Sequence, residues 1–141
     1  MRKVIPAFLV LFLVSCSSTK APVSKQLYEV LTTNNDGGAN IKFYEILTEP
    51  KEIMMLLGDE TLRKKISKDD TTNSSFIILN SGPTKETYNR IKVEKVIETA
   101  TNIEVYVKDT QKSTEQDLAD ENISYPYTII KINSKKPIVF K

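Results

Sequence analysis

Short apolar stretches separated by polar turns recur along most of the chain. Residues 27–32 and 41–48 are rich in β-branched and aromatic side chains, and the segment between them, Asn34-Asn35-Asp36-Gly37-Gly38, is a dense turn signal. We therefore predict that the two stretches pair as a hairpin. The continuous apolar run at 76–79, Phe-Ile-Ile-Leu, is typical of a strand covered on both faces.

A helical pattern fills the region between the second and third predicted strands. Pro50 follows Glu49, and proline is favoured at the first position of a helix. Gly58-Asp59 interrupts the pattern, which predicts two short helices. The apolar side chains near one helical face are Ile53, Leu56, Leu57, Leu62 and Ile66. The polar residues that follow, 67–75, predict a loop.

Two further strands are predicted at 91–97 and 103–107, joined as a hairpin by the five residues between them. Val93 and Val96 are three positions apart, which breaks the strict alternation of a strand. This spacing predicts a β-bulge in the first strand of the hairpin.

The last two strands are predicted at 128–132 and 138–140. The whole pattern predicts an α+β fold with a mainly antiparallel sheet of about seven strands. One short helical region lies between strands 2 and 3. We expect a single β-rich domain over residues 26–141, since a chain of this length buries enough apolar surface for one core.

The N-terminal residues have the features of a lipoprotein signal peptide. Arg2 and Lys3 precede an apolar run at 4–14, which is too short to span a bilayer. The run ends at Leu13-Val14-Ser15-Cys16, the pattern read by the lipoprotein signal peptidase. We therefore expect a signal peptide at 1–15, lipidation of Cys16 and a flexible tether over 16–25, which anchors the protein to a membrane.

Charge and location add two expectations. Loss of the signal peptide leaves 18 basic and 18 acidic side chains, and lysine alternates with glutamate along the strands, which argues against a nucleic-acid partner. Ser17 follows the lipidated cysteine in place of the aspartate that commonly retains lipoproteins in the inner membrane. The outer membrane of a Gram-negative bacterium is therefore the expected location, on its periplasmic or surface face.

The composition excludes most catalytic chemistry. The chain has no histidine, and its one cysteine is the expected lipid acceptor, so we expect no serine triad, cysteine nucleophile or common zinc site. Two carboxylate pairs, Asp69-Asp70 and Asp120-Glu121, occur in segments that we expect to be solvated. The acidic segment 115–121 lacks the ligand spacing and glycine of an EF-hand, which favours a solvated loop over a calcium site.

Tyrosines could form a platform that stacks on sugars. Tyr125 and Tyr127 flank Pro126 just before a predicted strand. The alternation of that segment favours ordinary strand residues, with one side in the core.

From the composition and motifs together, we predict no catalytic residue, no metal and no cofactor.

From Tyr28 onward the order of motifs resembles the PrcB family, lipoprotein subunits of a surface or periplasmic protease complex. The resemblance is best from Phe76 to Phe140. It rests on Tyr28-Glu29-Val30-Leu31, Gly37-Gly38, Phe43-Tyr44, the 76–79 strand followed by Gly82, Ile91-Lys92-Val93, and Tyr125-Pro126-Tyr127 with Ile129 and Ile130. It implies a non-enzymatic subunit that binds, stabilises or localises a protein partner, plausibly a secreted protease.

One turn departs from the family pattern. The family usually carries Pro-Thr-Gly-Gly-Tyr before the strand at Ile91, and the glycine pair is absent here. Loops on rigid sheets commonly carry recognition, so we predict this turn as the partner-binding segment, with the 109–122 loop as its rival. The predicted contact residues are Gly82, Pro83, Thr84, Lys85, Glu86, Thr87 and Tyr88.

Two alternative functions remain open at this point. A turn that inserts into an active-site cleft would make the protein a protease inhibitor, similar to the chagasin-like inhibitors. A large apolar cavity or an exposed row of tyrosines would instead indicate a small-ligand or glycan-binding lipoprotein.

Overall fold

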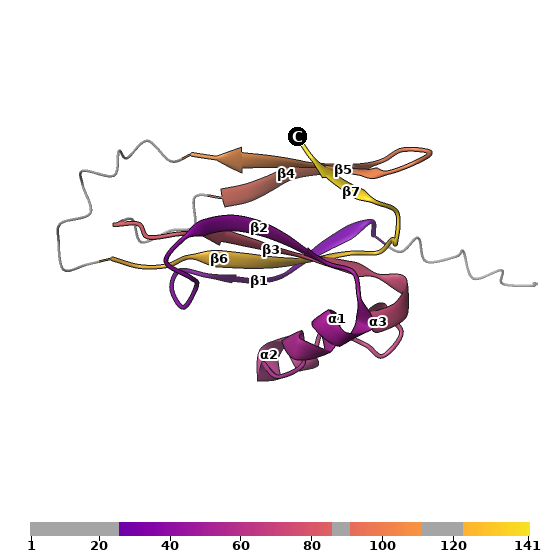
Figure 1. Ribbon diagram of the computed structural model, residues 1–141, viewed down its shortest axis with the longest axis horizontal. Helices are drawn as coiled ribbons and strands as arrows, with labels where there is room; N and C mark the ends of the chain where they lie inside the picture. The colour runs from indigo at the N-terminus through magenta and orange to yellow at the C-terminus, as the bar shows by residue number, and fades with distance from the viewer. Residues whose placement is uncertain (1–25, 86–90, 111–122) are drawn as a thin grey trace, which may run out of the picture.

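The computed structural model describes residues 26–85, 91–110 and 123–141, which form seven strands and three short helices (Figure 1). The strands are β1 (Tyr28–Asn34), β2 (Lys42–Leu47), β3 (Ser75–Ser81), β4 (Ile91–Glu98), β5 (Ile103–Asp109), β6 (Tyr127–Ile132) and β7 (Ile138–Phe140). The helices, all between β2 and β3, are α1 (Pro50–Leu56), α2 (Glu60–Arg63) and α3 (Asp70–Asn73). The predicted α+β class is confirmed.

A four-stranded antiparallel sheet with strand order β1-β6-β3-β2 forms the middle layer. Its central strand β3 is buried on both faces, as the apolar run at 76–79 predicted. The predicted hairpin between 27–32 and 41–48 is wrong, because β1 and β2 lie at opposite edges of this sheet. The strands between them, β6 and β3, are apolar on both faces, and the sheet places them where both faces are covered.

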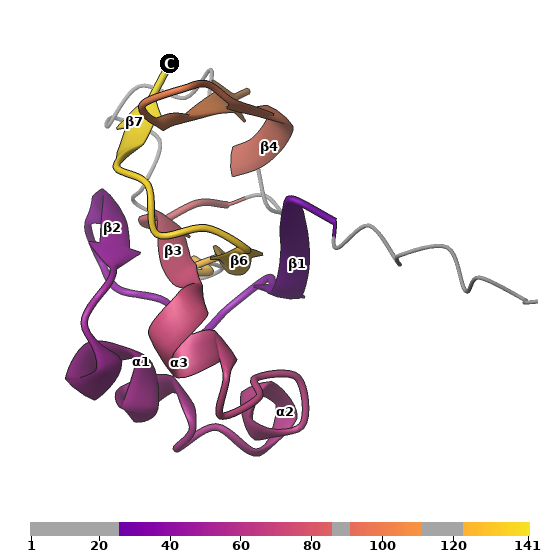
Figure 2. The same ribbon diagram turned by 90° about the vertical axis from the view of Figure 1, so that its right-hand side faces the viewer.

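The second sheet has three strands in the order β4-β5-β7. β4 and β5 form the predicted antiparallel hairpin, and the register shifts between Val93 and Lys95, where the bulge was predicted. β7 pairs with β5 in parallel. This sheet covers one face of the four-stranded sheet, and the helices cover the other (Figure 2).

Two hydrophobic cores follow from this layering, because successive side chains of a strand point to opposite faces. Phe76 of β3 and Ile129 of β6 pack toward the helices, where they meet Ile53 and Leu62. The intervening side chains, Ile77, Leu79, Ile130 and Ile132, pack against Ile91, Ile103 and Val105 of the second sheet. The four-stranded sheet is therefore covered on both faces.

The helices are short, and the first two begin where the sequence predicted. Pro50 opens α1, and the Glu52 carboxylate accepts the backbone N–H of Glu49 at 3.1 Å. Asp59 opens α2 by accepting the N–H groups of Thr61 and Leu62. The third helix was not predicted, since α3 lies in the segment expected to be a polar loop. No helix among the described residues is long and apolar enough to cross a membrane.

Candidate functional site

Three loops meet at one end of the four-stranded sheet, which we call the loop end. They are residues 35–41 between β1 and β2, residues 82–85 after β3, and residues 123–126 before β6. The strands β1 and β3 end here and β2 and β6 begin here, at the left in Figure 1. The loop end includes the first half of the predicted partner-binding turn.

Asn80 fastens the first loop to the sheet. Its side chain is 1% exposed, and its amide nitrogen donates to the Ala39 carbonyl at 2.9 Å and also to the Ile41 carbonyl. Its amide oxygen accepts the Ala39 N–H at 3.0 Å. A loop held by three such bonds to a buried side chain keeps a fixed shape.

The second contact of this loop is with the segment before β6. The Gly38 N–H donates to the Tyr125 carbonyl at 2.8 Å, and the Asp36 carboxylate accepts the Tyr125 N–H at 2.9 Å. Gly37 has a φ of 97°, which an L side chain rarely adopts, so the turn there depends on glycine. Gly37 and Gly38 are therefore structural residues of the loop end.

The described part of the predicted partner-binding turn, residues 82–85, is largely buried. Gly82 has a φ of 72°, and both Gly82 and Thr84 are buried. Thr84 exchanges two backbone hydrogen bonds with Ser124, at 2.9 and 2.8 Å. Lys85 is exposed, which places its ammonium group at the surface of the loop end.

The other predicted contact residues are not placed. Glu86, Thr87 and Tyr88 lie outside the described residues, as do Cys16, the acidic segment 115–121 and most of the rival loop at 109–122. The structure thus brings the buried half of the predicted turn together with residues 35–41 and 123–126.

A salt bridge joins the two sheets beside the loop end. Lys42, at the start of β2, binds the carboxylate of Asp109, at the end of β5. The hydrogen bond that the Lys42 ammonium donates to Asp109 raises the pKa of Lys42 above its ordinary value, because it favours the charged form. Lys42 also lies over the Tyr44 ring, 5.9 Å from its centroid.

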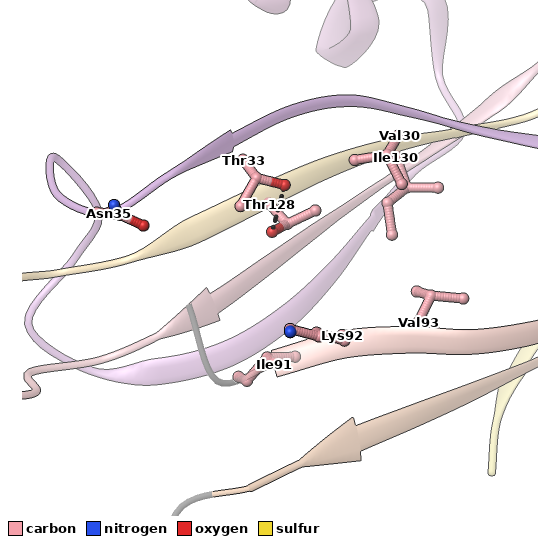
Figure 3. Close-up of a pocket in the computed structure, with 8 residues that line it drawn as sticks. All are labelled: Val30, Thr33, Asn35, Ile91, Lys92, Val93, Thr128 and Ile130. Carbon is pink, nitrogen blue, oxygen red and sulfur yellow. Dashed lines mark hydrogen bonds between the residues drawn. The ribbon is translucent and has the colours of Figure 1, made fainter. Parts of the chain in front are cut away.

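A cleft of about 430 Å³ opens between the two sheets on the side where β1 and β4 lie (Figure 3). β1 contributes Val30 and Thr33, and the loop after it contributes Asn35. β4 contributes Ile91, Lys92 and Val93, and β6 contributes Thr128 and Ile130. This cleft was not predicted. β1 and β4 have the pattern of half-buried strands and β6 that of a buried strand, and only the packing of the sheets brings the three together.

One carboxylate expected to be solvated is buried. Asp70 is 3% exposed, and its carboxylate accepts hydrogen bonds from the N–H and hydroxyl of Ser67 at 2.9 and 2.7 Å. Its oxygen also lies 3.4 Å from the ammonium of Lys131, which is 7% exposed. The ammonium reaches Glu29 on β1 at 3.2 Å as well. The prediction of a solvated Asp70 is wrong, because Lys131 of β6 points toward the helices beneath it.

This cluster is a structural ion pair between α3 and the sheet. Burial alone would raise the pKa of Asp70, but the hydrogen bonds from Ser67 and the charge of Lys131 outweigh burial and lower it. The carboxylate therefore stays ionised. Nothing in this cluster resembles the separated acid and base of a hydrolase.

Two further possibilities raised by the sequence are a metal site and a tyrosine platform. Among the residues that the structure describes, no three His, Cys, Asp or Glu side chains lie close enough together to hold a metal ion. Tyr125 and Tyr127 are half-buried, and the Tyr127 hydroxyl accepts a hydrogen bond from the Asn34 side chain at 2.6 Å. Tyr127 is the first residue of β6, as the alternation predicted, whereas Tyr125 lies before the strand, so the prediction is wrong for Tyr125.

Comparison with known proteins gives one match. No curated protein and no solved structure matches the chain. The model of the family described as PrcB C-terminal matches residues 75–133, the segment from β3 to β6 that contains Asn80, the predicted turn and one wall of the cleft. Over residues 75–133 the chain is therefore similar to the PrcB C-terminal family.

Proposed function

We propose that this chain is a non-enzymatic accessory subunit that binds a secreted or surface protease and stabilises or localises it. The match of residues 75–133 to the PrcB C-terminal family carries this proposal. An accessory role needs an ordered binding surface and no catalytic group. Among the described residues, the loop end offers such a surface.

The loop end is the proposed contact surface. Its loops are fixed to each other by the Asn80 amide and by the pairing of Thr84 with Ser124, so a partner would meet an ordered backbone. Ordered loops bind with a smaller loss of conformational entropy than flexible ones. Lys85 and Asp36 are exposed there and supply charges of both signs.

The membrane anchor is a separate part of the proposal. Cys16 follows the apolar signal run and would carry the lipids, and residues 16–25 would connect them to β1. Two or more acyl chains hold a protein on a membrane firmly, because each buried methylene contributes about 0.8 kcal/mol. We propose the outer membrane of a Gram-negative bacterium as the location.

Capture from the host tests the partner. The tagged protein is purified from host membranes in detergent, and the bound proteins are identified by mass spectrometry. We expect a protease in stoichiometric amount. Changing Lys85, Glu86 and Thr87 together to alanine should reduce its capture without moving the melting curve, because Lys85 is exposed and surface changes usually cost less than about 0.5 kcal/mol each.

A matched control uses exposed charges on the helix side. Glu60 and Lys64 form a surface ion pair on α2, and both are mostly exposed. Their double alanine variant should capture the protease normally. Equal capture by both variants would exclude the turn as the contact, and the absence of any protease from the wild-type sample would refute the proposed function.

The inhibitor alternative predicts a different result with the same materials. An inhibitory loop must protrude into the active-site cleft, whereas Gly82 and Thr84 are buried and Thr84 is paired with Ser124. We therefore expect the captured protease to keep its activity when the pure subunit is added in excess. A stoichiometric loss of peptidase activity would favour the inhibitor instead.

A further inference from the structure

β2 and β7 lie on one side of the sandwich, and β1 and β4 lie on the other (Figure 2). On the side of β2 and β7, the rings of Tyr44 and Phe140 meet with centroids 5.4 Å apart. On the opposite side lie β1 and β4, and the 430 Å³ cleft opens between them. The second side of the sandwich is therefore the open one.

Both strands beside the cleft are edge strands of the described sheets. Within the described part of the chain, β1 pairs only with β6, and β4 pairs only with β5. The other edge of each strand presents backbone N–H and C=O groups that no described strand pairs with. Such edges are templates for an added strand.

The cleft between these edges is apolar at its floor. Ile91 and Ile130 are 2% and 0% exposed, and they belong to the core between the sheets. Val30 of β1 also lines the cleft and is 48% exposed, which is high for a valine next to a core. An apolar side chain inserted here would cover Val30 and lie on the existing core.

The rim of the cleft carries a cation without a counter-charge. Lys92 is exposed and has no ion pair or hydrogen bond from its ammonium within residues 26–85, 91–110 and 123–141. Its cross-strand neighbour is another cation, Lys108, and the nearby Glu94 is paired with that lysine at 3.5 Å. A carboxylate brought to the cleft would therefore be attracted to Lys92.

We propose that this cleft binds one extended segment of the protein partner. The segment pairs its backbone with a free strand edge, inserts an apolar side chain beside Val30, and places an aspartate or glutamate near Lys92. An extended polypeptide is the occupant that uses all three features, because its side chains alternate between the cleft and solvent while its backbone faces the edge. This inference rests on the proposed function, since the segment belongs to the partner.

Selection from a peptide library tests the cleft without the partner. The protein, purified from its host in detergent, is exposed to a phage-displayed library of random peptides of about 10 residues, the length of a strand. We expect enriched peptides that alternate apolar and polar residues and contain Asp or Glu. Val30→Glu and Lys92→Glu should each weaken the binding of a synthetic copy by about tenfold or more.

Matched controls separate the cleft from a general charge effect. Val139→Glu changes a valine on β7 that is 38% exposed, and Lys68→Glu reverses an exposed lysine on the helix side. Both should bind the peptide as the wild type does. Replacing the acidic residue of the peptide by lysine should restore its binding to Lys92→Glu. N-methylation of every second peptide residue should abolish binding when the methylated amides are those that face the strand edge. Methylation of the other set of amides, which face away from the edge, should be tolerated.

Each other outcome overturns the inference. Peptides that bind Val30→Glu as well as wild type, or no enrichment at all, would exclude a strand site in the cleft. Binding of decanoate that depends on Lys92, without peptide enrichment, would assign the cleft to small apolar acids. Unchanged capture of the protease by Val30→Glu would refute the inference and leave the proposed function intact. Absence of captured protease would refute the function, while the peptide selection would still report on the cleft.

Discussion

Asn80 and Ala39 exchange two hydrogen bonds in opposite directions. The side-chain oxygen of Asn80 accepts the Ala39 N–H at 3.0 Å, and its nitrogen donates to the Ala39 carbonyl at 2.9 Å. The amide thus pairs with the loop as a neighbouring strand residue would. Because Asn80 is at the end of β3, its hydrogen bonds fix the position of the 35–41 loop relative to the sheet.

Asn80→Asp should destabilise the protein strongly. A carboxylate keeps the acceptor for Ala39 but cannot donate to the carbonyls of Ala39 and Ile41, and it brings a charge to a site that is 1% exposed. A buried polar group left without its partner costs about 1–3 kcal/mol, and a charged one costs more. Urea denaturation at neutral pH measures the loss in the free energy of unfolding.

Asn102→Asp is the matched control for this change. The side-chain oxygen of Asn102 accepts from the Thr99 hydroxyl at 2.7 Å, and that acceptor survives the substitution. Its stability should change by less than about 0.5 kcal/mol. An equal effect of the two substitutions would show that the Asn80 amide nitrogen does not hold the loop.

Gly38→Ala should also destabilise the loop end, through crowding. A Cβ atom at this position would lie 2.3 Å from the Asn80 side-chain oxygen and 2.7 Å from the Tyr125 carbonyl oxygen. Crowding of this kind typically costs about 1–3 kcal/mol. At Gly58, in contrast, the nearest atom is the Met55 carbonyl oxygen at 3.2 Å, so Gly58→Ala should have the smaller effect on the melting temperature.

Local patterns predicted the elements of this fold well and their partners poorly. The apolar run at 76–79 and the spacing of Val93 and Val96 identify a buried strand and a bulge, because burial and register leave a local trace. The choice of partner for β1 leaves no such trace. The dense turn signal at 34–38 indicated a hairpin, but the turn leads across the end of the sheet to its opposite edge.

In the candidate site too, local features were predictable from the sequence and long-range contacts were not. Gly37 and Gly82 were visible as turn residues, and both have positive φ. The burial of Asp70 was not predictable from its polar neighbours, since its counter-charge, Lys131, is 61 positions further along the chain. The cleft was equally hidden, because three separate strands contribute its walls.

Acid should weaken the protein through Asp70. The carboxyl has a folded-state pKa below its ordinary value of 3.8, so it stabilises the fold above the unfolded pKa. That contribution is lost as the pH falls below about 3.8 and through the folded pKa. The urea midpoint of the wild type should therefore fall in this range, and Asp70→Asn should lose part of this dependence.

Asp70→Asn should also lower stability at neutral pH. Removing one partner of a buried ion pair typically costs about 3–5 kcal/mol, and we expect the lower end because Glu29 stays near Lys131. The neighbouring Asp69→Asn is the control, since Asp69 is exposed and makes no side-chain cap. If the two variants unfold at the same urea concentration, the Asp70–Lys131 pair does not secure α3.

Cys16→Ala tests the proposed anchor. The substitution removes the thiol that would accept the lipid, so the protein should no longer incorporate labelled palmitate and should leave the outer-membrane fraction. Ser17→Ala is the control and should remain lipidated. Normal membrane partition of the Cys16→Ala protein would refute lipid attachment at this cysteine.

The position of β6 between β1 and β3 sets the order in which the protein can fold. Asn34 and Tyr127, which are hydrogen-bonded neighbours on adjacent strands, are 93 residues apart in the chain. Contacts of such long range slow folding, because the intervening chain must be ordered first. A chain emerging from a translocation channel N-terminus first cannot complete the central sheet until Tyr127–Ile132 has emerged. Until then β1 and β3 would expose unpaired edges, so a chaperone or the proposed partner would meet this protein first as an open sheet.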